Sequence, residues 1–271
     1  MSAPWEVYAI KYADRPGRTR ADSFLFDDNH DAPHAMDYFL WLLRREGQTI
    51  LVDTGYDAEE GAARGRPIRL DPRAALAPFD LTPEAITTLV CTHLHYDHAG
   101  GLHLFPEAQI HLQEEEMAFA TGRCMCEPVL RAPFTAAHVC EAVRRVYQGR
   151  VVFHNGDGAV ADGVTVHRIG GHSRGLQAVR VRTAEGWMCL ASDAAHYYEN
   201  ALAGKPFPIV VDLEDMQRGF ARIQALADAP GLLIPGHDPL VTEIFPVGPA
   251  GHIWRLDRGP MRTLPDYSGS D

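Results

Sequence analysis

The chain has 271 residues, which is enough to bury a large hydrophobic core in one domain or two. It carries 25 basic and 36 acidic residues, a formal net charge of −11, and this disfavours a nucleic-acid groove or binding to an anionic membrane surface. No apolar run approaches the roughly 18 residues that a membrane-spanning helix needs. The first residues also lack the basic and apolar regions of a secretory signal, so we predict a cytoplasmic protein.

The cysteine content gives little structural information. An odd number of cysteines does not suit a disulfide framework. Two of them, Cys124 and Cys126, leave open a minor metal or redox pair. The five positions are Cys91, Cys124, Cys126, Cys140 and Cys189.

Early strands are expected at residues 6–12, 37–44 and 49–52, and the second is apolar on both faces. The third ends at Asp53, in a strand-to-turn junction. An aspartate there either caps the turn or orients a metal-bound histidine. Residues 58–80 have no sustained hydrophobic period and are expected to form a loop with a short helix at 72–77.

The most informative stretch is 89–101, LVCTHLHYDHAGG, where a short apolar strand ends in a cluster of polar side chains. His93 and His95 are two residues apart, so on an extended chain they point to the same side. Asp97 and His98 are adjacent and diverge once the chain turns. One loop of this kind can bind two metal ions.

This HLHYDH segment resembles the HxHxDH signature of the metallo-β-lactamase superfamily. The resemblance implies an α/β fold of the four-layer αββα type, with metal ions between the sheets. We expect one such hydrolase domain over residues 1–271. The motif is specific only if further ligands follow it in the right order.

The middle of the chain adds a strand at 109–112 and a helix at 114–120. Glu114, Glu115 and Glu116 suit the amino-terminal turn of that helix and are expected to be solvated. Residues 121–140 break the pattern with Gly, Pro and Cys, and we interpret them as an insertion that caps the site.

The second half repeats one arrangement, a short strand followed at once by a potential ligand. His172 follows the strand expected at 164–169, Asp193 follows a hairpin, and His237 follows 232–234. His172 lies in GGHSRG, which resembles the GHSxG segment of the superfamily. A carboxylate such as Asp193 can bridge two cations.

The combined pattern implies two nearly equivalent metal sites. The first would consist of His93, His95 and His172, and the second of Asp97, His98 and His237, with Asp193 between them. Imidazole and carboxylate ligands suit zinc, our preferred metal, and are also compatible with iron, manganese or cobalt.

Within the superfamily the nearest resemblance is to the N-acyl homoserine lactonases, the quorum-quenching enzymes. It rests on LVDTGYD, THLHYDHAGG, GHSRGLQ, the Asp193-Ala194 pair and GHD at 236–238. The resemblance implies that a metal-bridging hydroxide opens a small lactone, an acyl homoserine lactone or another, including an aromatic one. Asp97 would hold the hydroxide and pass a proton to the leaving group.

In that group a tyrosine three residues after the bridging aspartate holds the substrate carbonyl, whereas this chain has His196 there, followed by Tyr197. A neutral imidazole can still donate a hydrogen bond to an oxyanion, so His196 and Tyr197 are candidate catalytic residues. Arg174 is interpreted as a solvated loop residue, with pairing to a substrate carboxylate as the alternative.

Other functions use a similar site. A cyclic amide or imide hydrolase needs the same hydroxide, and a glyoxalase-type thioesterase is the second alternative, although its family carries a further helical domain after the last ligand. A nuclease would need a basic surface, which the net charge of −11 disfavours. A non-catalytic metal-binding protein would be expected to lack one of the ligands, and none is missing here. We therefore expect a lactonase that acts on a small molecule as a monomer or homodimer.

Overall fold

The structure, a computed structural model, describes residues 2–267 and contains two β-sheets. The larger sheet has seven strands, in the order β12 (Ile253–Arg255), β1 (Glu6–Arg15), β2 (Met36–Arg45), β3 (Gln48–Val52), β4 (Thr88–Val90), β5 (Gln109–Gln113) and β6 (Val151–His154). The smaller sheet has five, in the order β11 (Leu233–Pro235), β10 (Gly186–Ser192), β9 (Gln177–Thr183), β8 (Val164–Arg168) and β7 (Gly158–Ala161).

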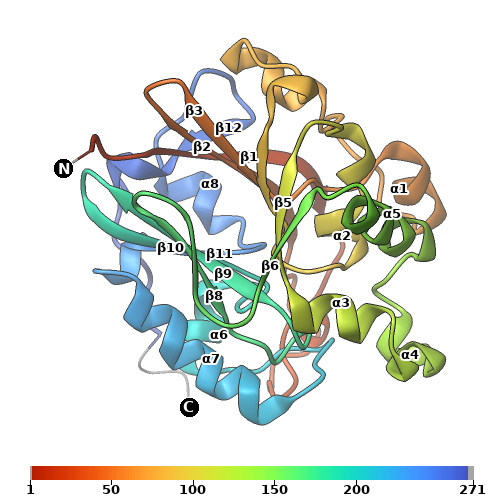
Figure 1. The fold of residues 1–271 in the computed structure, drawn as a ribbon. Coiled ribbons are helices and arrows are strands. Elements are labelled where there is room, and N and C mark those ends of the chain that lie inside the picture. Colours follow the sequence, from red (N-terminus) through yellow and green to blue (C-terminus); the bar gives the residue numbers. More distant parts are fainter. Residues whose placement is uncertain (1, 268–271) are drawn as a thin grey trace.

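Helices cover the outer faces of both sheets (Figure 1). The α-helices are α1 (Ala58–Ala63), α2 (Tyr96–Ala99), α3 (Glu114–Ala120), α4 (Pro128–Arg131), α5 (Ala136–Tyr147), α6 (Tyr198–Ala203), α7 (Leu213–Leu226) and α8 (Leu240–Ile244). Short 3-10 helices span Arg20–Asp22, Ala74–Phe79, Pro83–Ala85, Leu102–Leu104, Arg123–Cys126, Pro230–Leu232 and Leu256–Arg258. Among the described residues, no helix combines the length and apolar character needed to cross a membrane.

Side chains alternate between two cores along the central strands, and this alternation produces the layers. On β2, Phe39 and Trp41 pack between the sheets against Val179 of the smaller sheet. Tyr38 and Leu40 point the other way, into the core beneath α2 and α5. A third core lies between the smaller sheet and α7. The arrangement is helix, sheet, sheet, helix, and the predicted αββα sandwich is confirmed.

Most expected elements are present, with two differences. The stretch 58–80, expected to be a loop with one short helix at 72–77, also contains α1, whose N-cap Asp57 accepts a hydrogen bond from the Glu60 backbone N–H at 2.9 Å. Its apolar content is too low to give a helical period, so local capping determines this helix. Strand β7, which precedes the expected strand at 164–169, was not predicted. All five cysteines are free.

Strand direction brings the predicted ligands to one edge of the sandwich. Strands β3, β4 and β5 run parallel to one another, and β10 runs parallel to β11. Parallel neighbours end at the same edge of a sheet. Asp53 follows β3 directly, while Asp193 and His237 follow β10 and β11. The polar residues at these strand ends therefore meet between the two sheets.

Candidate metal centre

Seven residues that the sequence predicts as metal ligands converge in one buried cluster. They come from the loop after β4, from α2, and from the segments after β8, β10 and β11. Their exposed fractions run from 0% to 9%, so the cluster lies inside the protein. The residues are His93, His95, Asp97, His98, His172, Asp193 and His237.

Asp193 lies at the middle of this cluster, and its two oxygens face opposite ways. Its Oδ2 is 3.2 Å from His172 Nε2 and 3.9 Å from His93 Nε2. Its Oδ1 is 3.2 Å from His98 Nε2 and 3.0 Å from His237 Nε2. This geometry suits a carboxylate that bridges two cations.

The remaining distances divide the ligand atoms into the two predicted sets. His172 Nε2 lies 2.9 Å from His95 Nδ1. On the other side, Asp97 Oδ2 lies 3.9 Å from His98 Nε2 and 3.8 Å from His237 Nε2. Each set brings imidazole nitrogens to a common point that one cation can occupy.

Several of these converging atoms are buried without a partner. Within residues 2–267, His93 Nε2, His98 Nε2 and Asp193 Oδ1 are inaccessible to solvent and form no hydrogen bond. Leaving buried polar atoms unsatisfied costs about 1–3 kcal/mol for each group. Cation binding would satisfy all three, so the residues present fit a pair of divalent metal ions.

A network behind the ligands fixes their orientation. His98 Nδ1 donates to Asp53 Oδ2 at 2.8 Å, and the Thr92 backbone N–H donates to Asp53 Oδ1 at 2.7 Å. The Thr92 hydroxyl lies 3.1 Å from His93 Nδ1. Such contacts set the tautomer and angle of a metal-binding imidazole. Of the two roles considered for Asp53, its contact with His98 matches that of a residue that orients a histidine.

Glu116 accepts hydrogen bonds from the loop that carries His93 and from the loop that carries His172, which contradicts its expected solvated position. It is fully buried, and its Oε1 accepts a hydrogen bond from Leu94 N–H, between His93 and His95, at 2.9 Å. Its Oε2 accepts from Gly175 N–H at 2.9 Å and from the Ser173 hydroxyl, next to His172. The prediction was wrong because the helix begins against the histidine loops rather than in solvent.

Burial and charge determine the protonation of the cluster. Burial lowers the pKa of His93 and His95 well below the usual value, which favours the neutral imidazole that binds metal. Burial acts in the same direction on His98, but the carboxylates of Asp193 and Asp53 outweigh it and raise the pKa of His98. Metal binding to such a cluster releases protons.

The two candidate catalytic residues occupy different surroundings. His196 lines the cavity over the cluster, and its Nε2 lies 3.0 Å from Asp193 Oδ2. Burial lowers the pKa of His196 to about 3, so its imidazole is neutral. Tyr197 is also buried, but its hydroxyl donates to the Ala35 carbonyl at 3.2 Å, and Tyr197 is not among the residues that line the cavity.

Two connected cavities lead to the cluster. The inner one, of about 60 Å³, lies against the ligands, and its wall includes Tyr38 and Tyr96. The outer one, of about 620 Å³, shares Tyr96 with it and is lined largely by apolar side chains. Pro133, from the segment expected to cap the site, lines both cavities, and the Phe134 ring lies 4.6 Å from the His95 ring.

Sequence reasoning missed several residues of the inner cavity. Tyr96 lies inside the HLHYDH motif and could have been suspected from that position alone. Tyr38 lies on β2, where both faces are apolar, so its sequence context gives no indication of a site. Arg15, Arg18 and Arg66 come from stretches with no motif, and only the fold brings them to the cavity.

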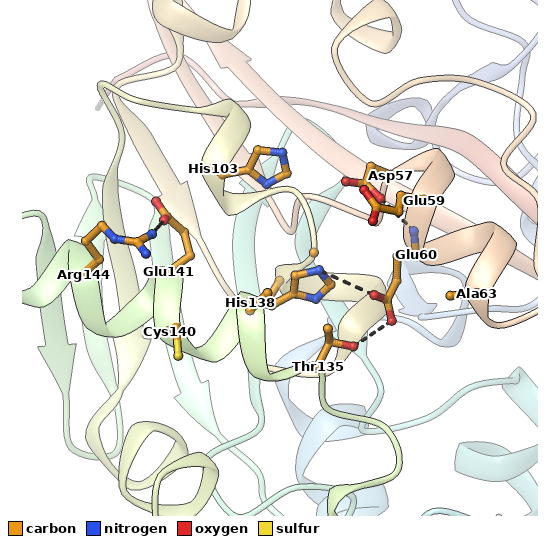
Figure 2. Close-up of a pocket in the computed structure, with 13 residues that line it drawn as sticks. Asp57, Glu59, Glu60, Ala63, His103, Thr135, His138, Cys140, Glu141 and Arg144 are labelled. Atoms are coloured by element: carbon orange, nitrogen blue, oxygen red, sulfur yellow. Dashed lines mark hydrogen bonds and ion pairs between the residues drawn. The ribbon is translucent and has the colours of Figure 1, made fainter.

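A separate cavity, of about 480 Å³, lies between α1 and α5 and is shown in Figure 2. It also contains histidines and carboxylates, among them Glu60, Glu141 and His138. Glu60 accepts a hydrogen bond from the Thr135 hydroxyl at 2.6 Å and pairs with Arg64. Among the described residues, no group of side chains close enough to share a metal ion includes any residue of this cavity.

Comparison with known proteins agrees with this geometry. Residues 38–241 match the model of the Metallo-beta-lactamase superfamily. An N-acyl homoserine lactonase of Rhizobium rhizogenes is 28% identical over 224 residues, which cover 73% of this chain and 78% of that protein. An acyl-coenzyme A thioesterase of Gallus gallus is 31% identical over 149 residues, and this chain spans only about half of its length (50%).

A solved structure of an N-acyl homoserine lactone hydrolase, with the product N-hexanoyl-L-homoserine bound at its catalytic metal center, has the same fold. The TM-score is 0.72 at 22% identity, and the match covers 88% of this chain and 95% of the other. The family match spans every candidate ligand in the cluster, from His93 to His237. The chain belongs to the metallo-beta-lactamase superfamily.

Proposed function

We propose that this protein is a metal-dependent hydrolase that opens a lactone ring, and that its seven-residue cluster holds two metal ions, preferentially zinc. The observation that carries the proposal is Asp193, whose oxygens each lie within 3.2 Å of histidine nitrogens from a different predicted set. Two such cations, when bound, supply a nucleophilic hydroxide at neutral pH and polarise the carbonyl of the substrate.

The residues of the chain have distinct roles in this proposal. Asp97 faces both the second ligand set and the inner cavity, where its carboxylate can hold a proton for transfer to the leaving oxygen. His196 is a neutral donor beside Asp193, and it orients this carboxylate or stabilises charge on the substrate oxygen. Of the two candidate catalytic residues, Tyr197 has less support than His196, because its hydroxyl already donates a hydrogen bond to the Ala35 carbonyl.

Thioester hydrolysis is the second candidate, because the curated relatives include acyl-coenzyme A thioesterases. It needs the same nucleophile and differs in the leaving group. The lactonase proposal is favoured by the lactonase relative, which aligns over 73% of this chain, against 50% for the thioesterase. Cyclic amide hydrolysis uses the same arrangement and is the third candidate.

The test combines elemental analysis with hydrolysis assays. Purified protein is analysed for metal and is then assayed with lactones, cyclic amides and thioesters by release of acid, before and after chelation. We expect about two metal equivalents and lactone opening that is lost on chelation and restored by zinc. Activity on thioesters or amides alone would contradict the lactonase proposal.

A further inference from the structure

Three arginines line the inner cavity over the metal centre. Arg15 ends β1, Arg18 lies in the following turn, and Arg66 follows α1. Arg66 also lines the larger outer cavity. Three guanidinium groups from separate segments therefore share one wall with Asp97 and His237, two of the proposed ligands.

None of these arginines forms an ion pair with a carboxylate among residues 2–267. Arg66 donates to the Tyr96 hydroxyl, and Arg18 donates to the Asp22 carbonyl at 2.5 Å. The Arg18 Nε is buried without a hydrogen-bond partner. Asp22 lines the cavity too, but its carboxylate accepts a backbone N–H instead.

Arg20, which is close to Arg18 in sequence, does form ion pairs with carboxylates. Arg20 lies just outside this group, and its guanidinium pairs with both Asp27 and Glu199 at 2.7 Å. A chain with a net charge of −11 has carboxylates available for neutralisation. Within the described part of the chain, the three arginines of the inner cavity nevertheless form no ion pair, although Asp22, Asp97 and Asp193 line the same cavity. Cations held by Asp97 and Asp193 would neutralise those two carboxylates, and the arginines would then favour an anion that enters the cavity.

We propose that the substrate carries an anionic group, a carboxylate or a phosphate, close to its scissile carbonyl, and that Arg15, Arg18 and Arg66 bind that group. The planar guanidinium fork matches both anions with paired hydrogen bonds. Apolar side chains of the outer cavity, including Val129, Leu130 and Ile209, accommodate the remainder of the substrate. The inference rests on the proposed function and specifies its substrate class.

Arg174, the arginine that the sequence suggested for a substrate carboxylate, is not part of this group. Its side chain is exposed, and its guanidinium lies 5.7 Å from the Phe119 ring centre. It lines neither the inner nor the outer cavity. Arg174→Gln is therefore a matched control, because it removes one positive charge near His172 in sequence without changing the cavity wall.

The first experiment compares a γ-butyrolactone that carries a ring carboxylate with the corresponding primary amide. We expect wild-type kcat/KM to be at least about 10-fold higher for the acid, since hydrogen bonds to charged groups contribute about 1.5–3 kcal/mol. A parallel pair, a γ-butyrolactone with a phosphorylated hydroxymethyl group on the ring and the same lactone without the phosphate, shows whether phosphate is the preferred anion. Equal kcat/KM within both pairs would overturn the proposal.

The second experiment uses Arg66→Gln and Arg18→Gln with Arg174→Gln as the control. We expect each cavity variant to raise KM for the anionic substrate about 10-fold while leaving the amide unchanged, and the control to leave both unchanged. An equal loss on both substrates would contradict an anion-binding role. If neither lactone is opened, the lactonase proposal fails separately. The ring-opened hydroxy diacid should still raise the Tm of the wild type but not of Arg66→Gln, and protection equal in both proteins would overturn the anion site.

Discussion

The inner cavity of the metal centre and the cavity between α1 and α5 both contain histidines and carboxylates, and they differ in how those groups are paired. In the acidic cavity of Figure 2, Glu60 accepts a hydrogen bond from Thr135, and Glu141 pairs with Arg144. Glu60 also pairs with Arg64. In the metal centre, imidazole nitrogens and Asp193 Oδ1 converge in a buried space without hydrogen-bond partners. Among the described residues, His138 Nδ1 in the acidic cavity is also buried without a hydrogen bond, so neither residue type nor one unsatisfied atom defines a metal site, whereas several buried ligand atoms that converge do.

The walls of the two cavities also differ in charge. Asp57, Glu59, Glu60 and Glu141 contribute acidic groups to the cavity between α1 and α5. The inner cavity of the metal centre places arginines around its carboxylates instead. Once two divalent cations neutralise the carboxylates there, the arginines leave that cavity positive. An anionic substrate is thus favoured at one cavity and disfavoured at the other.

The largest expected effect comes from Asp193→Ala, which removes the carboxylate between the two ligand sets. We expect metal content to fall to one equivalent or less, and lactone hydrolysis to fall at least ~10³-fold, equivalent to about 4 kcal/mol in the barrier. Elemental analysis and kcat measurements check this. The matched change in the acidic cavity, His138→Ala, should leave both quantities unaltered, and metal loss in His138→Ala would refute the distinction between the cavities.

A smaller effect is expected from Glu116→Gln. The amide can still accept from the Leu94 N–H but cannot accept from both Gly175 N–H and Ser173, so the loop that carries His172 loosens. Changes behind metal ligands typically weaken metal binding by about 10–100-fold, and we expect this range in a competition titration with a chromogenic chelator.

Glu114→Gln is the control for Glu116→Gln, because it makes the same change at an exposed position of the same helical turn. It should leave metal affinity at the wild-type value. Equal affinities in all three proteins would show that Glu116 serves stability only.

The smallest effect is expected in the acidic cavity, from Glu60→Gln. Burial raises the pKa of Glu60, but hydrogen bonds from Thr135 and Arg64 outweigh it and hold the pKa below the ordinary value of 4.5. The ionised form therefore contributes stability that is present above pH 4.5 and is lost as the pH falls through the folded-state pKa. Glu60→Gln should cost about 1 kcal/mol in the free energy of unfolding at pH 7.

The pH dependence distinguishes this interpretation from general destabilisation. Urea unfolding between pH 7 and pH 3 should show a shallower loss of stability in Glu60→Gln than in the wild type, with metal content unchanged. Glu59→Gln, at an exposed position of the same helix, should follow the wild type. Parallel curves for all three proteins would exclude Glu60 as a source of the pH dependence.

The sandwich was predicted from the resemblance to the metallo-β-lactamase superfamily, whereas the candidate ligands also followed from a physical pattern. Each ligand directly follows a short apolar run, and parallel strands bring such positions to one edge, so the local pattern contains the three-dimensional arrangement. The contact between Asp53 and a histidine of the cluster was also predictable, because Asp53 follows a strand next to β4. That histidine is His98, which donates to Asp53 through Nδ1.

Other features depended on tertiary packing and could not be read from local pattern. Glu116 looks like any acidic residue at a helix start, and only the approach of the His172 loop buries it. Arg18 and Arg66 lie in segments without hydrophobic period, and the fold alone brings them to the inner cavity. Whether residues 121–140 act as a cap stays a prediction.

The most direct test of the central claim is metal stoichiometry in three proteins, the wild type, His172→Ala and His237→Ala, measured by elemental analysis after dialysis. His172 belongs to one proposed set and His237 to the other. The account predicts about two equivalents in the wild type and about one in each variant, with a different cation retained. Fewer than one equivalent in the wild type, or unchanged content in both variants, would contradict a two-metal centre built by these residues.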